Sequence, residues 1–345
     1  MKINNNLDAV NDVLTHPDFI WTWKESPKGK KQSLYIPYLQ SIAKVSKSIW
    51  LISFNGGEVR ADTRQIDSIL FYGASGAIPL EFLDDLRAHA IHVIIHRRNV
   101  PVPCIISPGL ASDPHDLLTK QIIQRANKTQ CAYLARVFIR EKLIACQYLS
   151  TTSATSLKTL AACRHVQSVR SIEATAAKKY WAAYFERLNI SDGKRRDFDH
   201  PVNEALDAGS LFLSGILLRW CLFHKFSPYH GFLHEPTAYI SLVYDLMEPY
   251  RHWVDQAVLV AYENGGAENL IPRSIELLKN KLDSSCYVPA THQNVRCKSL
   301  LHGIVLSLRA WLLDEQTRFV VPVEGKKKGG RPPSLGFVIP GYKVN

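Results

Sequence analysis

The sequence has few of the features that mark secreted, membrane or zinc-finger proteins. Its seven cysteines are an odd number and contain no Cys-x-x-Cys pair, which argues against a disulfide framework and against a structural zinc site. No run of 18 apolar residues occurs, so we expect no transmembrane helix and no membrane partner. The first residues, MKINNNLDAVNDVLTH, lack the apolar core of a signal peptide. We therefore expect a cytoplasmic protein with reduced cysteines.

Positive charge, in contrast, is present in excess. The chain has 42 Lys and Arg against 31 Asp and Glu, a formal net charge of +11, which favours a polyanionic partner such as nucleic acid. Charge alone separates that hypothesis only slightly from a soluble basic protein. Hydrophobic residues make up 46% of the 345 positions, which is enough for two cores and excludes a disordered or collagen-like chain.

The apolar pattern changes near residue 100. Before it, the apolar runs 48–54, 66–72 and 91–95 predict strands, and Asn55-Gly56 predicts a tight hairpin. After it, helical spacing dominates. We therefore predict an α+β fold, with a β-rich N-terminal domain followed by an all-α catalytic domain. The expected parts are an N-terminal domain at 1–100 with one helix at 80–89, a linker rich in proline at 101–113, a helical domain at 114–315 and a basic, flexible tail at 316–345.

Further helices are expected within the second domain. Their predicted ranges are 155–190, 200–224, 238–263, 269–282 and 296–315. In the tail, Gly330-Arg331-Pro332 beside lysines resembles the core of an AT-hook, which binds the DNA minor groove. So short a match is weak evidence, and a plain solvated tail is the favoured interpretation.

Two candidate site residues stand out in the helical half. Glu173 lies among small residues on a predicted helix, which leaves room for a substrate or a metal beside its carboxylate. His234 lies in a short Gly/Pro loop between two apolar helices, from which it can reach a cleft. Each feature alone is also typical of an ordinary protein, as a surface glutamate or as a packed or capping histidine.

A third candidate is a pair of acids. Asp245 and Glu248 are spaced i, i+3, so both face the same side of a helix. Two carboxylates this close repel each other unless a cation or a basic neighbour such as Arg251 lies between them. Oxygen ligands suit Mg²⁺ or Mn²⁺. An acidic helix face paired with arginine explains the same residues without a metal.

Together these segments resemble the family of CRISPR spacer-acquisition integrases, the larger, metal-dependent subunit of the adaptation complex. The order of the segments and the gap of 11 residues between His234 and Asp245 match the family. The resemblance covers roughly residues 45–265. The residues that carry it are Ile172-Glu173-Ala-x-Ala-Ala177 with Tyr180-Trp181, Pro201-Val-Asn203-x-Ala-Leu206 with Gly209, Gly231-Phe-Leu-His234, and Ser241-Leu-x-x-Asp245-Leu-x-Glu248-Pro-x-Arg251.

The resemblance implies an enzyme that inserts spacer DNA into a repeat array. A 3′-hydroxyl of the incoming DNA attacks a phosphodiester at the repeat boundary, and Mg²⁺ or Mn²⁺ assists. It implies Glu173, His234 and Glu248 as metal ligands, with Asp245 as the adjacent supporting catalytic acid. It further implies a homodimer, double-stranded DNA with 3′ overhangs, repeat DNA and a small bridging adaptation subunit as partners. Position 248 is often aspartate in the family, and Asp207 stands where many members have asparagine. Residues 1–45 have no clear counterpart, which suggests an extension.

Basic residues around the predicted site indicate a path for DNA. They are Lys178, Lys179, Lys194, Arg195, Arg196, Lys225 and Arg251. Contacts of such residues with phosphates give an affinity that falls with salt, although any single lysine is equally typical of a solvated surface. Three alternatives remain open at this point. They are a transposase-like integrase of a mobile element, a catalytically inactive DNA-binding scaffold, and a helical RNA-binding module, for which no known signature is present.

Overall fold

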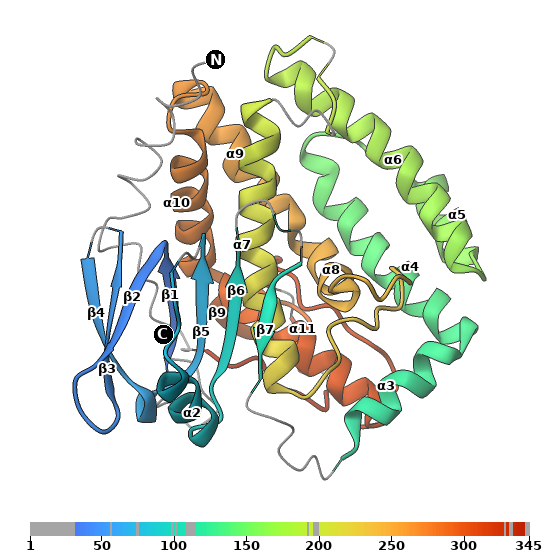
Figure 1. Ribbon diagram of the computed structural model, residues 1–345. Coiled ribbons are helices and arrows are strands. Elements are labelled where there is room, and N and C mark those ends of the chain that lie inside the picture. Colours follow the sequence, from blue (N-terminus) through green and yellow to red (C-terminus); the bar gives the residue numbers. More distant parts are fainter. Residues whose placement is uncertain are drawn as a thin grey trace. The chain divides into compact units, whose positions relative to one another are not determined.

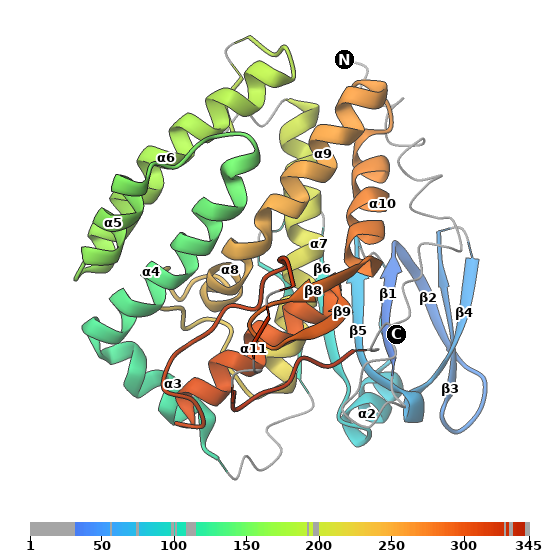
Figure 2. The same ribbon diagram turned by 180° about the vertical axis from the view of Figure 1, so that it is seen from behind.

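The chain consists of two compact units, Met1–Asp113 and Pro114–Asn345. The structure is a computed structural model that describes residues 32–55, 57–73, 76–97, 100, 102–107, 115–191, 193–195, 200–327, 329–330 and 334–341. The first unit is rich in strands and the second is mainly helical (Figures 1 and 2). This arrangement confirms the predicted fold class. The division follows the segment 101–113 that the sequence predicts as a linker.

In its described residues, the N-terminal unit contains two sheets and one α-helix. One sheet has the strand order β1-β5-β6-β7 and the other has the order β2-β3-β4. The elements are β1 (Gln32–Pro37), β2 (Leu39–Lys44), β3 (Ile49–Phe54), β4 (Gly57–Asp62), η2 (Thr63–Gln65), β5 (Ile66–Tyr72), α2 (Leu80–Ala88), β6 (His92–His96) and β7 (Cys104–Ile106). The strands and the helix that the sequence predicts are all present, and β3 and β4 form the expected antiparallel hairpin.

The two sheets and α2 share one hydrophobic core. β5 pairs in parallel with β1 and with β6, and its residues Ile69, Leu70 and Phe71 are fully buried. A parallel strand covered on both faces reads as a continuous apolar run, which is why the sequence signal was clear here. Trp50 donates from Nε1 to Asp85 of α2 at 2.7 Å, which satisfies its one polar atom inside the core.

Residues 32–44, which fall in the segment 1–45 that is expected to be an extension, are part of the two sheets. These residues form β1 and β2, which pair with β5 and β3. Leu39 and Ile42 of β2 are buried while most of their neighbours are exposed. A pattern with so few apolar positions gives a weak strand signal, and β2 is a strand because it pairs with β3. Residues 1–31 lie outside the described residues.

The second unit contains the helices that position the candidate site. α4 lies alongside α6 in both views (Figures 1 and 2). The elements are α3 (Leu117–Ala126), α4 (Lys128–Ala145), η3 (Cys146–Tyr148), α5 (Ala154–Ala162), α6 (Val166–Arg187), α7 (Pro201–Phe223), α8 (Ser241–Met247), η4 (Glu248–Tyr250), α9 (Arg251–Gly265), α10 (Leu270–Asp283), β8 (Ser285–Val288), β9 (Gln293–Arg296) and α11 (Cys297–Leu312).

Two predicted helices are interrupted in the structure. The range 155–190 is divided because Cys163 and His165 are extended, so that α5 ends at Ala162 and α6 begins at Val166. The range 238–263 is divided at Pro249, which has no N–H to donate and lies in the short turn η4 between α8 and α9. The sequence did not indicate the hairpin β8–β9, whose two strands have only four residues each.

α7 is the central apolar helix of this unit. By length and composition alone, it is long and apolar enough to cross a membrane, and 67% of its most apolar window is buried inside the fold. Burial in a protein core accounts for such a composition without a bilayer. Pro201 in the first turn is a clear sequence signal for the start of α7. In the structure, His200 caps this end by accepting a hydrogen bond from the Val202 N–H.

The expectation of a flexible tail is wrong for four of its apolar residues. Phe319, Val321, Phe337 and Ile339 are all buried. The Gln293 side chain donates to the Ile339 carbonyl and accepts from its N–H, both at 3.0 Å. The basic composition of the tail as a whole concealed two apolar segments at its ends, which pack as any apolar segment does. Arg331, the central residue of the AT-hook-like sequence, lies outside the described residues.

Candidate functional site

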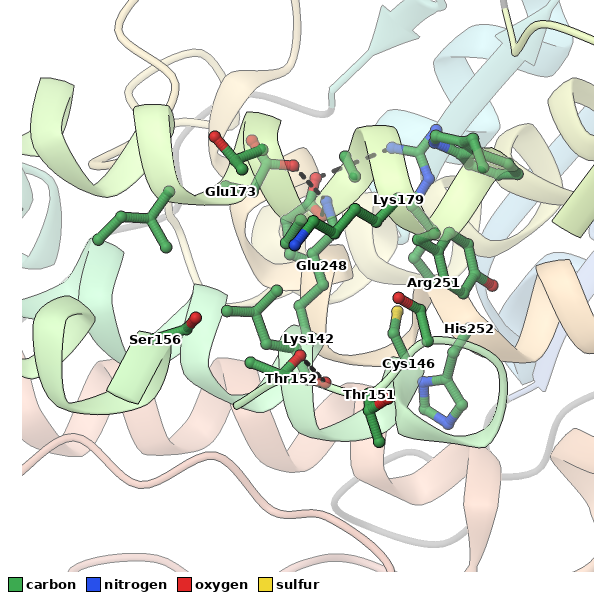
Figure 3. Close-up of a pocket in the computed structure, with 18 of the residues that line it drawn as sticks. Lys142, Cys146, Thr151, Thr152, Ser156, Glu173, Lys179, Glu248, Arg251 and His252 are labelled. Atoms are coloured by element: carbon green, nitrogen blue, oxygen red, sulfur yellow. Dashed lines mark hydrogen bonds and ion pairs between the residues drawn. The ribbon is translucent and has the colours of Figure 1, made fainter. Parts of the chain in front are cut away.

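A pocket of about 620 Å³ lies in the helical unit between α4, α5, α6 and the segment around η4 (Figure 3). Glu173 contributes from α6, Glu248 from η4 and His234 from the loop before α8. The structure therefore brings together the three residues that the resemblance implies as metal ligands. Hydroxyl side chains form another part of the lining. They are Ser150, Thr151, Thr152, Ser153, Thr155, Ser156 and Thr159.

Lys142 of α4 lies between the two glutamates. Its Nζ is 2.6 Å from Glu173 Oε1 and 2.6 Å from Glu248 Oε2, as the dashed lines in Figure 3 indicate. The Glu248 side chain is 5% exposed, whereas that of Glu173 is 26% exposed. A second cation, Arg251, approaches Glu248 Oε1 at 3.8 Å. The acidic centre is thus balanced by two basic side chains.

Charge decides the protonation of this centre. Burial alone would raise the pKa of Glu248, but Lys142 and Arg251 outweigh it and lower that pKa to about 2. Burial likewise acts to lower the pKa of Lys142, and the carboxylates of Glu248 and Glu173 reverse this effect and raise it. The two groups are therefore held ionised, as a buried ion pair requires.

Asp245 holds the loop that carries His234. It is fully buried and accepts hydrogen bonds from the N–H groups of Phe232 at 2.5 Å, Leu233 at 2.9 Å and His234 at 3.0 Å. A Cβ at Gly231 would lie 2.8 Å from Asp245 Oδ2, so the close approach of loop and carboxylate requires glycine there. Asp245 is absent from the pocket lining. Its carboxylate positions the loop.

Asp245 also orients the imidazole of His234. The His234 Nδ1 lies 2.7 Å from Asp245 Oδ1. When Nδ1 carries the proton and donates to the carboxylate, Nε2 is left as the ring atom with a lone pair for a ligand. Burial lowers the pKa of His234, but the hydrogen bond and charge of Asp245 outweigh this effect and raise it. A histidine backed by a carboxylate is a common arrangement at metal centres.

The donor set suits a divalent cation. In the described part of the chain, no three His, Cys, Asp or Glu side chains form a ready-made metal site. The Lys142 ammonium already lies between two of the candidate ligands, where it supplies the positive charge that a metal ion would supply. Two carboxylates and one imidazole are ligands that Mg²⁺ and Mn²⁺ accept. The residues present therefore fit such an ion.

The predicted DNA-binding residues divide into three groups. Lys179, Arg195 and Arg251 line the pocket. Lys178, Lys194 and Lys225 do not, and Arg196 lies outside the described residues. Arg195 forms an ion pair with Asp207 and lies over the Trp181 ring, at 5.6 Å from its centre. Asp207, which stands where many family members have asparagine, therefore has a basic partner at the pocket.

Sequence reasoning missed the polar end of the pocket. Asp255 is buried and accepts from the Tyr180 hydroxyl at 2.9 Å, and the Tyr148 hydroxyl lies 2.6 Å from that of Tyr180. Burial raises the pKa of Asp255. Lys142 was missed as well. It is one of three consecutive charged residues in the sequence VFIREKLIA, and nothing local distinguishes it from the other two.

Comparisons with known proteins identify the family. The family model of the CRISPR associated protein Cas1 matches residues 40–269. The CRISPR-associated endonuclease Cas1 2 of Pyrobaculum aerophilum is 27% identical over 242 residues, which are 66% of this chain and 81% of that protein. A casposase bound to its integration product has a similar fold, with a TM-score of 0.68, 21% identity and coverage of 83% of this chain and 92% of the other.

A Cas6-RT-Cas1–Cas2 complex also contains this fold. The TM-score is 0.70 at 15% identity, with coverage of 88% of this chain and 37% of the matched chain. These structural likenesses concern the fold, whereas the family model spans well over half of the sequence with its site segments included. The chain belongs to the CRISPR-associated Cas1 family.

Proposed function

We propose that this protein is a metal-dependent integrase that inserts spacer DNA into a CRISPR array by transesterification. Membership of the Cas1 family makes the chain a CRISPR-associated endonuclease or integrase. The observation that carries the finer proposal is the meeting of Glu173, Glu248 and His234 at one pocket, from three different segments of the chain. Carboxylates this close in a buried site are favoured where a cation is to be bound.

The proposed reaction exchanges one phosphodiester for another. The oxygen of a 3′-hydroxyl on the incoming DNA attacks a phosphorus atom at the repeat boundary. A new P–O bond forms, the old P–O bond breaks, and the proton of the attacking hydroxyl passes through solvent to the departing 3′-oxygen. No energy-rich cofactor is needed. Hydrolytic nicking is the same chemistry with water as the nucleophile.

The chain's own residues divide this work. Glu173, Glu248 and the Nε2 atom of His234 would hold Mg²⁺ or Mn²⁺, and a bound ion stabilises charge on the phosphate and lowers the pKa of the attacking hydroxyl. Asp245 keeps the imidazole oriented. Lys179 and Arg195 lie at the same pocket and would contact phosphates on either side of the reacting one.

The proposed partners follow from the same assignment. They are double-stranded DNA with 3′ overhangs, repeat DNA, a second copy of the chain and a small bridging Cas2-type subunit, and the proposed location is the cytoplasm. The net charge of +11 supports binding to DNA. The similar fold within a Cas6-RT-Cas1–Cas2 complex supports the bridging subunit.

A transposase-like integrase of a mobile element is the second candidate. The observation that favours it is the likeness to a casposase bound to its integration product. The residues and the chemistry would be the same in both cases. The DNA ends would differ, because a transposase selects terminal inverted repeats and an adaptation enzyme selects a repeat array.

A strand-transfer assay tests both candidates. Purified protein would be mixed with Mn²⁺ or Mg²⁺, a short duplex with 3′-hydroxyl overhangs that either carries or lacks terminal inverted repeats, and a supercoiled plasmid that carries either a repeat or an unrelated sequence. Glu173→Gln should reduce joining about 100-fold or more, since a bound cation supplies several kcal/mol and each 1.4 kcal/mol is tenfold in rate. Preference for the repeat plasmid supports the adaptation enzyme, and preference for inverted-repeat ends supports the transposase.

The matched control lies on the same helix. Glu186 of α6 is exposed and lies outside the pocket, so Glu186→Gln removes the same charge without touching the site. Equal activity of the two variants, or joining by the wild type in EDTA, would refute the proposal.

A further inference from the structure

We propose that Lys142 is a built-in counter-cation of the acidic site, which a divalent metal must displace, so that this lysine sets how tightly the site binds metal. The inference rests on the proposed metal dependence. It goes beyond that proposal because it assigns a role to a residue that is neither a metal ligand nor a DNA contact.

The geometry places Lys142 where a cation is needed. Its Nζ lies 2.6 Å from one oxygen of each glutamate, within direct ion-pair distance of both. Figure 3 shows the side chain reaching from α4 to carboxylates that come from α6 and η4. The Lys142 side chain is 17% exposed, so solvent screens these contacts only weakly. One ammonium thus joins the three segments that form the acidic centre.

The fold needs such a cation when no metal is bound. Glu248 is 4% exposed, and a carboxylate this buried is strongly destabilising without a partner. Arg251 alone is a weaker substitute, because it lies 3.8 Å from Glu248 and belongs to the same short stretch of chain. Lys142 also holds Glu173 on the neighbouring helix. The lysine therefore keeps the candidate ligands together in the absence of metal.

The same contacts oppose metal binding. A divalent ion held by Glu173 and Glu248 would require the oxygens that now contact the ammonium, and two cations at that separation repel each other. The lysine must then leave its present position, and the pocket that it lines gives the side chain space to do so. The free energy of metal binding is consequently the free energy gained from the metal contacts minus the free energy lost with these two ion pairs.

Lys179 offers a matched comparison. It lines the same pocket and carries the same charge, but it makes no ion pair with an acidic side chain in the described part of the chain. Neutralising Lys179 removes a positive charge from the pocket without freeing a carboxylate. The effect of Lys142 on metal binding should therefore greatly exceed that of Lys179.

The experiment is a calorimetric titration of the full-length protein with Mn²⁺ at pH 8. Lys142→Met should bind Mn²⁺ about tenfold or more tightly than the wild type, because a competing charge a few ångströms from the ion is removed. Lys179→Met should stay within about threefold. The melting temperature of Lys142→Met in EDTA should fall below that of the wild type and rise more on addition of Mn²⁺. Binding by Lys142→Met that is equal to or weaker than wild type overturns the proposal.

A second measurement does not depend on a neutral variant that folds. The side-chain ¹⁵Nζ resonance of Lys142, identified by its loss in Lys142→Arg, should change on titration of the wild type with diamagnetic Mg²⁺, while that of Lys179 changes less. An unchanged Lys142 resonance at saturating Mg²⁺ overturns the proposal, because the ammonium would then have kept its two partners.

These outcomes separate this inference from the proposed function. If the wild type binds Mn²⁺ and joins DNA while Lys142→Met binds no more tightly, only the role of Lys142 fails. If neither protein binds Mn²⁺ at millimolar concentration, the role of Lys142 and the metal-dependent reaction fail together. Binding by Lys142→Met alone supports the inference directly.

Discussion

α6 and α7 are nearly equal in length, at 22 and 23 residues, but they differ greatly in how much of each helix is buried. α7 has 15 buried residues and forms the centre of the helical unit, whereas α6 has four, three of which lie in its last eight positions. The N-terminal part of α6, which carries Glu173, is therefore largely exposed along the pocket. The stability of this unit and its proposed chemistry therefore depend on different helices.

The two helices differ in sequence as they do in burial. α7 is apolar on almost every side, as expected for a helix that other helices surround. α6 has small residues around Glu173 and two lysines directly after them. The small side chains on this part of α6 leave space in the pocket. The aromatic residues at 180, 184 and 185 are buried and pack the C-terminal end of the helix against the core. Substitutions should therefore have different consequences in the two helices.

The largest effect on stability is expected from a cavity in α7. Leu217 is fully buried, so Leu217→Ala should lower the free energy of unfolding by about 3 kcal/mol. Lys178→Ala, on the exposed face of α6, should change it by no more than about 0.5 kcal/mol. Urea denaturation followed by circular dichroism measures both. Comparable losses for the two variants would show that α6 is as much a part of the core as α7.

The second prediction concerns the close packing of α7 against α9. A Cβ at Gly209 would lie 2.6 Å from Val254 Cγ1, a distance that no real contact allows. Gly209→Ala should therefore cost about 1–3 kcal/mol of folding free energy, although alanine is the better helix former. Val254→Ala removes the clashing methyl group, so the double variant should be more stable than the sum of the single variants predicts. If the two single effects simply add, α7 and α9 move apart to accommodate the added methyl group, and the close contact is not what makes the substitution costly.

Much of the fold was predictable from local patterns. Continuous apolar runs gave β3, β5 and β6, and helical spacing gave α2, α7, α10 and α11 to within a few residues. Local patterns failed where pairing with a distant segment makes the element, as for β2, β8 and β9. They also failed where a few apolar residues in a basic segment pack, as Phe337 and Ile339 do.

The candidate site was predictable only in its acidic and histidine members. Their residue types and spacing carry a family resemblance that extends along the chain. The partners that give them their roles lie in other segments of the chain. Lys142 reads as one more charged residue on a helix until Glu173 and Glu248 are placed beside it. Asp245 reads as half of an acidic pair, whereas in the structure its oxygens are occupied by the His234 loop.

The third prediction tests the C-terminal end of α7, where His224 and His302 meet. Their Nε2 atoms lie 2.7 Å apart, so one must donate and the other accept. Burial lowers the pKa of His224 to about 3, with smaller contributions from Arg309 and Arg219. Burial also lowers the pKa of His302, and the nearby His224 and Arg219 add to this.

The sign of the pH effect follows from these two pKa values. Between pH 6.5 and about 3 the unfolded chain binds protons that the folded His224 does not, so stability falls as the pH falls through this range. Each histidine should cost about 1 kcal/mol between pH 6.5 and 5.5. His224→Gln should therefore flatten the pH dependence of urea unfolding over that interval. An unchanged slope would contradict the assignment of this pair as neutral.

The smallest effect is expected from the two adjacent lysines of α6, Lys178 and Lys179. Lys179 lines the pocket and Lys178 does not, so a DNA strand at the site would contact Lys179 first. Lys179→Ala should lower the slope of log K against log salt for binding to a short duplex by about 1, the contribution of a single phosphate contact. Lys178→Ala should change the slope by much less. Fluorescence anisotropy at several salt concentrations measures both slopes, and a larger change for Lys178 would place the DNA on the other face of α6.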